Sequence, residues 1–124
     1  MASETKIHRW DDIEYEELGP AIGRKAVHSD RMTLARIYVK KGGVVPRHQH
    51  ENEQVSYVLE GRLRFYFDDR EEVVAAGEMM QIRSQEPHKV EALEDSVALD
   101  IFQPVREDWL RGDDQYLRNP TAPS

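Results

Sequence analysis

The sequence predicts an all-β fold, a jelly-roll sandwich or small barrel that ends in a short helix or turn. Apolar residues alternate with polar ones along several short segments, as in strands that bury one face. Turn-forming residues separate these segments every ~8 to 16 positions, from Gly42-Gly43 to Pro104. The alternation of strands and long helices that builds a parallel sheet is missing from the pattern.

The predicted strands follow one another from residue 32 to residue 102. The first contains Met32 and Leu34 and continues over residues 35–39. The others cover residues 55–59, 63–67, 72–75, 79–82, 88–93 and 97–102. Each has about the length of an ordinary strand. Strands of this kind bury one face and leave no long free edge when they close into a jelly roll or barrel.

The C-terminal part of the chain differs from the strand region. Residues 106–117 are the one helix candidate, and Gly112 should weaken or end that helix within two turns. Residues 119–124 resemble a loose tail. A chain of 124 residues has the size of one domain, so we expect a single domain over residues 1–124. Its barrel core should cover about residues 25–104 and its C-terminal extension residues 105–124.

Composition excludes several classes of partner. The formal net charge is -7 and there is no dense run of Lys and Arg, which argues against nucleic acid and against an anionic membrane. No apolar run approaches the roughly 20 residues that span a bilayer, and no apolar leader opens the chain, so a cytoplasmic protein is expected. Cysteine is absent, so a bound metal must rest on nitrogen and oxygen ligands.

Three histidines and a glutamine form a candidate metal site. His48 and His50 are two residues apart and lie on the same face of an extended segment. Gln54 follows after a bend at residues 51–52, and His88 begins another predicted strand that an antiparallel fold can bring close. His8 and His28 have no such neighbours, and we expect ordinary structural roles for them.

The spacing of these residues resembles the first cupin motif, Gly-x5-His-x-His-x3-Glu-x6-Gly, in which both histidines and the Glu are ligands. The matching residues are Gly42, His48, His50, Gln54 and Gly61. Gly77 and His88 resemble the glycine and the ligand histidine of the second motif, Gly-x5-Pro-x-Gly-x2-His-x3-Asn. The departures from the two motifs are Gln54, Arg83, Gln85 and Ala92. The resemblance implies a cupin barrel with one divalent metal on His48, His50, Gln54 and His88.

Gln54 in place of the acidic ligand leaves four neutral ligands, so the full 2+ charge is available to an anionic substrate. It also removes a carboxylate that could act as a base at the metal. Donors of this type suit zinc, nickel, manganese or iron about equally. The alternative is a decayed site that no longer binds metal.

The predicted strand 97–102 carries the candidate catalytic residues. Its odd positions are apolar and should face a packed layer, which places Ala98, Asp100 and Phe102 together on the other face. If that face is the outer surface, Asp100 is simply solvated. If it is the barrel interior, Asp100 is a carboxylate near the metal and beside an aromatic wall.

Residues 100–110 resemble the segment after the last strand of the KdgF-type pectin-degradation cupins. Those small cupins share the His, His, Gln, His ligand set and convert 4,5-unsaturated monouronates into linear keto sugar acids. The resemblance implies that Asp100, Phe102 and Arg106 line the active site. There Asp100 would shuttle a proton, Phe102 would exclude water, and Arg106 would bind the carboxylate of a small anionic sugar acid.

Other interpretations stay open at this point. The chain could be another metal-dependent cupin, a dioxygenase, lyase or isomerase, or a sensor module that binds a metal or sugar without catalysis. Arg106 could form a surface ion pair with Glu107 or Asp108, and Arg62 and Arg64 could lie on a solvated strand face.

We also expect a homodimer, because some predicted strand faces expose apolar side chains. These are Met79, Met80 and the residues of 73–76, although core packing explains them equally well.

Overall fold

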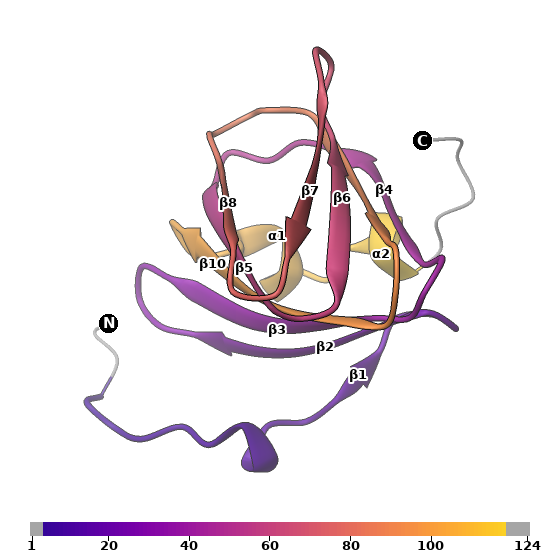
Figure 1. Ribbon diagram of the computed structural model, residues 1–124. Helices are drawn as coiled ribbons and strands as arrows, with labels where there is room; N and C mark the ends of the chain where they lie inside the picture. Colours follow the sequence, from indigo (N-terminus) through magenta and orange to yellow (C-terminus); the bar gives the residue numbers. More distant parts are fainter. Residues whose placement is uncertain (1–3, 119–124) are drawn as a thin grey trace.

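The computed structural model describes residues 4–118 and contains two antiparallel sheets packed face to face (Figure 1). The larger sheet has six strands in the order β1 (Glu16–Glu17), β2 (Ile22–His28), β3 (Thr33–Val39), β10 (Ser96–Gln103), β5 (Glu53–Glu60) and β8 (Met79–Ile82). The smaller sheet has four, in the order β4 (Val44–His48), β9 (His88–Ala92), β6 (Arg62–Tyr66) and β7 (Glu71–Ala75). The all-β prediction is confirmed.

Seven of these strands coincide with predicted segments to within two residues at either end. β1, β2 and β4 were not predicted, and β2 shows why. The side of β2 that carries Ile22 and Ala26 also carries Arg24 and His28, so polar residues interrupt its apolar pattern. Both polar residues have partners, since Arg24 pairs with two carboxylates and His28 bonds to Thr33. The larger sheet begins at Glu16, whereas the barrel core was predicted to begin at about residue 25.

The hydrophobic core lies between the two sheets. Phe65 and Leu63 from β6 face Val58 from β5 and Ala98 from β10, and all four are at most 3% exposed. Alternation along each strand explains this, because every second side chain points to the same face. Met80, which was considered for an interface, packs against this core instead.

β10 is the central strand of the larger sheet and pairs with β3 and β5. Ala98 and Phe102 are buried, and they line the interior together with Asp100. The interior alternative for Asp100 is therefore the observed one. The odd positions of this strand do not face a packed layer, because they lie on the outer face of the sheet and are half-buried.

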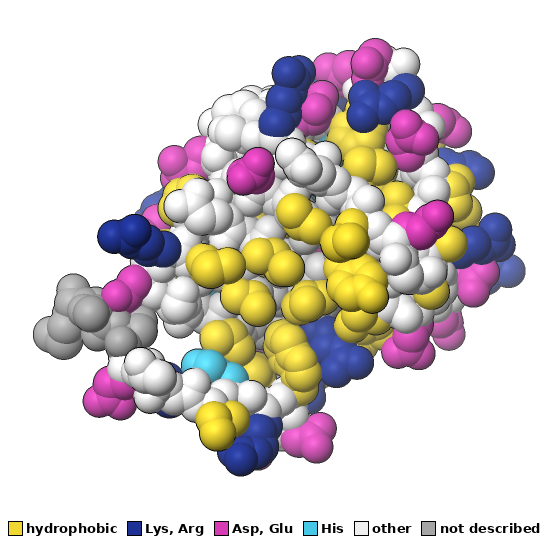
Figure 2. All heavy atoms as spheres, turned by 60° about the vertical axis from the view of Figure 1, so that its left-hand side comes forward, with side chains coloured by type: hydrophobic (Ala, Val, Ile, Leu, Met, Phe, Trp, Pro, Cys, Tyr) yellow, Lys and Arg dark blue, Asp and Glu magenta, His cyan; other side chains and the backbone are white. Residues whose placement is uncertain are grey.

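That outer face is apolar across several strands. Tyr57 of β5 lies between Leu99 of β10 and Met79 of β8 in the strand register. Tyr57 and Met79 are 36% and 64% exposed. Figure 2 shows hydrophobic side chains gathered in the middle of the face that lies to the left in Figure 1. The face is compatible with a second copy of the chain, and the homodimer stays a prediction.

Residues 105–118, which we call the C-terminal cap, cover the space between the sheets with two short helices. They are α1 (Glu107–Leu110) and α2 (Gln115–Arg118), separated by Gly112, whose φ is +80°. The predicted helix is thus broken where glycine was expected to end it, because this backbone conformation favours glycine. The predicted tail at residues 119–124 lies outside the described residues. No helix within residues 4–118 is long and apolar enough to cross a membrane.

An ion-pair network ties the C-terminal cap to the larger sheet. Arg24 on β2, 3% exposed, donates to Asp114 of the cap at 3.0 Å and to Glu16 of β1 at 3.0 Å. Arg118 also pairs with Asp114, at 2.9 Å. Trp109 covers the guanidinium of Arg24, with its ring centroid 4.4 Å away. The cap is therefore held from its outer side by charge as well as by apolar contact.

Replacing Asp114 by Asn should lower the free energy of unfolding by about 3 kcal/mol at pH 7, because buried Arg24 would lose one of two carboxylate partners. Burial raises the pKa of Asp114, but hydrogen bonds from Arg118 and Arg24 outweigh it and leave the pKa below its usual value. Such a group stabilises the fold above its unfolded-state pKa and stops doing so as the pH falls through the folded-state value. The difference between the two proteins in urea unfolding should therefore shrink below about pH 4.

Asp113→Asn is the matched control, because its carboxylate pairs with Arg111 in an exposed ion pair. It should change stability by less than about 0.5 kcal/mol. Equal effects of the two substitutions would contradict an anchoring role for Asp114.

Candidate metal centre

The strand registers bring the candidate ligands to one end of the barrel. His48, at the end of β4, lies directly opposite His88, at the start of β9. Gln54 is near the start of β5 and pairs with Phe102 of β10. His50 lies in the loop between β4 and β5. All four side chains are buried or half-buried. The pairing of β4 with β9 places His48 beside His88, and the pairing of β5 with β10 places Gln54 beside Phe102.

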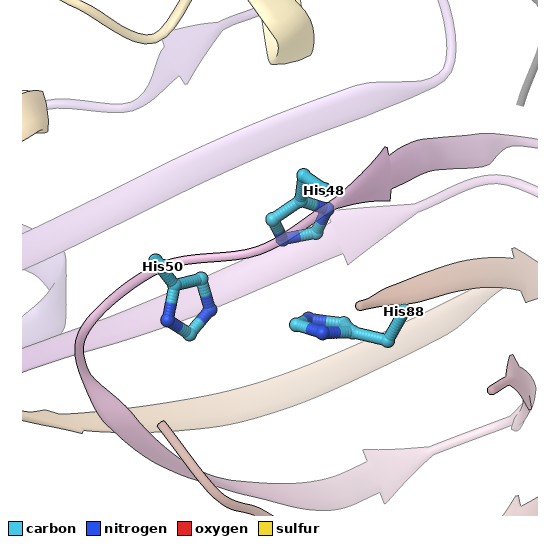
Figure 3. Close-up of side chains that lie close together, drawn as sticks. All are labelled: His48, His50 and His88. Carbon is cyan, nitrogen blue, oxygen red and sulfur yellow. The ribbon is translucent and has the colours of Figure 1, made fainter. Parts of the chain in front are cut away.

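The three imidazole rings face a common point (Figure 3). One ring nitrogen from each of His48, His50 and His88 lies within 4.8 Å of the others. The ring centroids of His48 and His88 are 4.3 Å apart, and that of His50 is 5.5 Å and 5.4 Å from them. Of the described histidines, His8 and His28 lie outside this cluster.

Backbone carbonyls determine which nitrogen of each ring carries hydrogen. Nδ1 of His48 lies 2.8 Å from the oxygen of Pro46, and Nδ1 of His88 lies 2.8 Å from that of Glu86. Nδ1 of His50 lies 3.0 Å from the oxygen of Asn52. A carbonyl oxygen only accepts, so each Nδ1 must donate its hydrogen. In each neutral ring, Nε2 therefore keeps its lone pair for a metal ion.

The surroundings keep these rings neutral. The pKa of His48 is lowered to about 3, mainly by burial and next by the neighbouring His88. Burial also lowers the pKa of His50 to about 4, with Arg106 as the next cause. The pKa of His88 is lowered by burial as well. Metal binding requires neutral imidazole, so the protein need not release protons from this site near pH 7.

Gln54 completes the donor set through its carbonyl oxygen. Its Nε2 donates to Ser56 Oγ at 2.8 Å, which turns Oε1 toward His50 Nε2 at 3.0 Å. Two acceptor lone pairs then face each other at hydrogen-bond distance, with no hydrogen between them. A cation bound by both atoms would satisfy this arrangement. The residues present therefore fit a divalent ion.

Asp100 is connected to this donor set through Ser56. Ser56 Oγ donates to Asp100 Oδ1 at 2.7 Å, and the register places the two residues side by side on β5 and β10. Burial raises the pKa of Asp100 to about 6, although the hydrogen bond from Ser56 opposes the rise. A carboxyl group with this pKa exchanges protons readily at neutral pH.

Phe102 and Arg106 lie beside the histidines. Phe102 is 2% exposed, and its ring meets that of His50 edge to face at 5.7 Å. Arg106 is 1% exposed, and its guanidinium lies against the rings of both Phe102 and Trp109, at 4.7 Å and 4.5 Å from their centroids. Its Nε and Nη2 donate to both carboxylate oxygens of Asp108. The ion pair with Asp108 that was considered as an alternative is present, but it is not on the surface.

Arg62 and Arg64 are not part of the site. Arg62 pairs with Glu94, and Arg64 lies near Glu71, with all four side chains well exposed. They lie on a solvated face, as the alternative interpretation expected. Asp100 and the buried Arg106 are thus the charged residues that line the cavity beside the donor set.

The donor set opens into a narrow cavity between the sheets, with a volume of about 50 Å³. Its polar lining includes His48, Gln54, Ser56, His88, Ser96, Asp100 and Arg106. The other lining residues are mostly apolar, and the C-terminal cap contributes Trp109 and Tyr116.

Sequence reasoning missed three residues that shape the site. Ser56 could have been found, because it lies two positions after Gln54 on the same face of a strand. Asn52 orients His50 through its backbone oxygen and donates to Val105 with its side chain, and a bend offers no signal for this. Tyr116 stacks on His48 at 4.7 Å from a helix far along the chain, which the local pattern does not reveal either.

Comparison with known proteins agrees with this architecture. The family model described as "Cupin domain" matches residues 35–102. The chain is 31% identical over 103 residues to "Pectin degradation protein KdgF" of Dickeya dadantii, covering 81% of this chain and 94% of the relative. These matches confirm the resemblance on which the sequence interpretation rests.

Solved structures give the same result. The structure of KdgF from Halomonas sp. has a TM-score of 0.75 and 27% identity, and the match covers 80% of this chain and 94% of that one. An RmlC-like cupin from Shewanella frigidimarina has a TM-score of 0.80 and 25% identity, covering 88% and 99%. The all-β fold is therefore of the cupin type.

Purified protein should bind one zinc or other divalent ion per chain, and His50→Ala should weaken that binding more than about 100-fold. The variant loses one of three convergent imidazoles, and its remaining donors cannot replace it. Isothermal titration of chelator-treated protein with zinc, with elemental analysis of the product, measures both quantities. His8→Ala is the control, because His8 is exposed and remote from the cluster. Unchanged zinc affinity in His50→Ala would contradict the site.

Proposed function

The chain belongs to the cupin family, and on that premise we propose that it is a metal-dependent enzyme that opens and ketonises 4,5-unsaturated monouronates. The products would be linear keto sugar acids. Its similarity to KdgF proteins supports the substrate class, because a protein named for pectin degradation acts in a pathway that releases uronates. The observation that carries the proposal is the hydrogen-bonded link from the metal donor Gln54 through Ser56 to Asp100.

His48, His50, Gln54 and His88 would hold one divalent ion, with zinc, nickel, manganese and iron all compatible with the donors. When bound, the ion would supply Lewis acidity toward a substrate oxygen. All four donors are neutral, so its charge is not reduced by the ligands. This favours a substrate with a carboxylate, and it offsets a protein whose net charge is -7.

Asp100 is the proposed proton carrier. In ring opening, the anomeric hydroxyl of the substrate loses its proton, the bond from the anomeric carbon to the ring oxygen breaks, and an aldehyde and an enol form. In ketonisation, the enol oxygen loses its proton and the other carbon of the enol double bond, now in a linear chain, gains one. The overall reaction is an isomerisation and needs no further reactant. Asp100 lines the cavity and could accept and return the proton in each step.

Arg106 and Phe102 would define the rest of the pocket. Arg106 has Nε and Nη2 committed to Asp108, so Nη1 is the nitrogen left to contact a substrate carboxylate. Arg106 would then bind the carboxylate through one nitrogen and not through both arms of the guanidinium. Phe102 supplies an apolar wall between His50 and the cap, which keeps water from the reacting atoms.

Asp100→Asn should reduce turnover of unsaturated galacturonate at least about 100-fold, because the amide cannot carry the proton. An NMR time course on freshly generated unsaturated monouronates measures the rate. Metal content should be unchanged, since Asp100 is not one of the donors. Asp69→Asn, a fully exposed surface change, should keep the full rate. Full turnover by Asp100→Asn would end the proton-carrier role, and oxygen consumption by the wild type would favour a dioxygenase.

Gln54→Glu should keep the metal but weaken binding of galacturonate about 10-fold, because a negative donor reduces the charge that attracts the carboxylate. Calorimetric titration of the metal-loaded variant with galacturonate and with its neutral parent sugar, galactose, separates charge from shape. The loss should appear with the acid alone. Tighter galacturonate binding in this variant would contradict the electrostatic part of the proposal.

A further inference from the structure

Tyr116 lies inside the candidate site although it comes from the C-terminal cap. Its ring stacks on that of His48, with centroids 4.7 Å apart and an interplanar angle of 27°. It lines the same cavity as Asp100 and Gln54. The fold places it there because α2 packs against β4, the strand that ends in His48. A ligand held at the histidine cluster would meet this side chain directly.

The hydroxyl group of Tyr116 is oriented by two donors. Arg106 Nη2 donates to its oxygen at 2.8 Å, and Trp109 Nε1 donates at 3.4 Å. A phenol oxygen offers two acceptor lone pairs and one hydrogen. Both acceptor positions are used, so the hydrogen is the group left to bond, and no acceptor for it is found among residues 4–118. This hydroxyl can therefore donate to an oxygen atom of a ligand.

The cavity is too small for a sugar acid in the observed conformation. Its volume is about 50 Å³, whereas pockets for small organic ligands measure about 300 Å³ or more. A volume of this size holds one or two water molecules. Rigid strands of both sheets form most of the lining, and the C-terminal cap forms the rest. Entry of a monouronate requires the cap to move.

Gly112 provides a hinge between α1 and α2. Gly112 separates α2 from α1, and no atom lies within 4 Å of where its Cβ would be, so rotation there meets open space. On the inner side, α2 is held by the Tyr116 hydrogen bonds, by the stacking of Tyr116 on His48 and by Leu117, which is buried in the core. On the outer side it is held by two ion pairs to the larger sheet, from Asp114 to Arg24 of β2 and from Arg118 to Glu16 of β1.

We propose that Tyr116 is a ligand-binding residue on a movable lid. α2 swings away from His48 to admit a sugar acid and, on closing, places the Tyr116 hydroxyl as a hydrogen-bond donor to an oxygen of the bound ligand. The chemical class of the ligand rests on the proposed function. The lid itself rests on the cavity volume and on the contacts of Tyr116.

The test uses metal-loaded protein carrying Trp10→Phe, so that Trp109 of α1, which contacts Tyr116 of the lid, is the single tryptophan. Galacturonate is titrated while Trp109 emission and calorimetric heat are recorded. The emission should change on binding, because Trp109 Nε1 donates to the hydroxyl of Tyr116, which moves with α2. Tyr116→Phe in the same background should bind galacturonate about 3- to 10-fold more weakly, with unchanged metal content. Tyr57→Phe, on the outer face of the larger sheet, should bind as the parent does.

Equal galacturonate affinity in Tyr116→Phe and Tyr57→Phe would overturn the ligand contact. Binding without any change in Trp109 emission would overturn the lid. The emission is measured on the parent protein, so this outcome can be interpreted even if Tyr116→Phe loses its metal. Absence of galacturonate binding to the loaded parent would overturn the whole inference. Binding with the predicted Tyr116 effect, but without turnover of unsaturated monouronates, would instead support the inference and refute the proposed reaction.

Discussion

The site depends on a simple constraint, the hydrogen bond from each histidine Nδ1 to a backbone carbonyl. These three bonds fix the tautomer, the ring plane and the direction of Nε2 at once. They also tie the donors to the backbone of the strand ends, which the sheets hold rigidly. Burial then disfavours protonation of the rings, so the same packing that positions the donors keeps them able to bind a cation.

A second consequence concerns charge. The donor set is neutral, and the buried cation Arg106 is largely balanced by Asp108 at 2.7 Å. The positive charge that a carboxylate would meet therefore comes mainly from a bound ion. This differs from a site in which an acidic ligand neutralises the metal and arginines attract the substrate. Asp100, connected through Ser56 and Gln54, would be sensitive to that ion through two hydrogen bonds rather than through direct contact.

The strands and the histidine cluster were predictable from sequence because both depend on short-range regularities. Alternation marks strands, and the positions of His48, His50 and His88 match two motifs. β2 was missed because Arg24 and His28 occupy inward positions, and their partners lie on other elements. For the same reason the sequence did not show that Arg106 donates two hydrogen bonds to the carboxylate of Asp108. It also did not show that the apolar odd positions of β10 lie on the outer face of the sheet. Contacts between distant segments leave little trace in a local pattern.

The C-terminal cap extends this argument from structure to function. Its inner residues, Trp109 and Tyr116, are fixed by Arg106 and by His48, so the cap and the site share the same side chains. Its outer anchor, Asp114, bonds to Arg24 of β2. This strand was not predicted from the sequence because its inward face carries polar residues. Arg24, one of the two polar residues that interrupt the pattern of β2, thus also holds the cap over the cavity. Apolar packing between these short helices and the sheets is therefore not the only interaction that holds the cap, because without Asp114 the buried Arg24 would keep Glu16 as its one carboxylate partner.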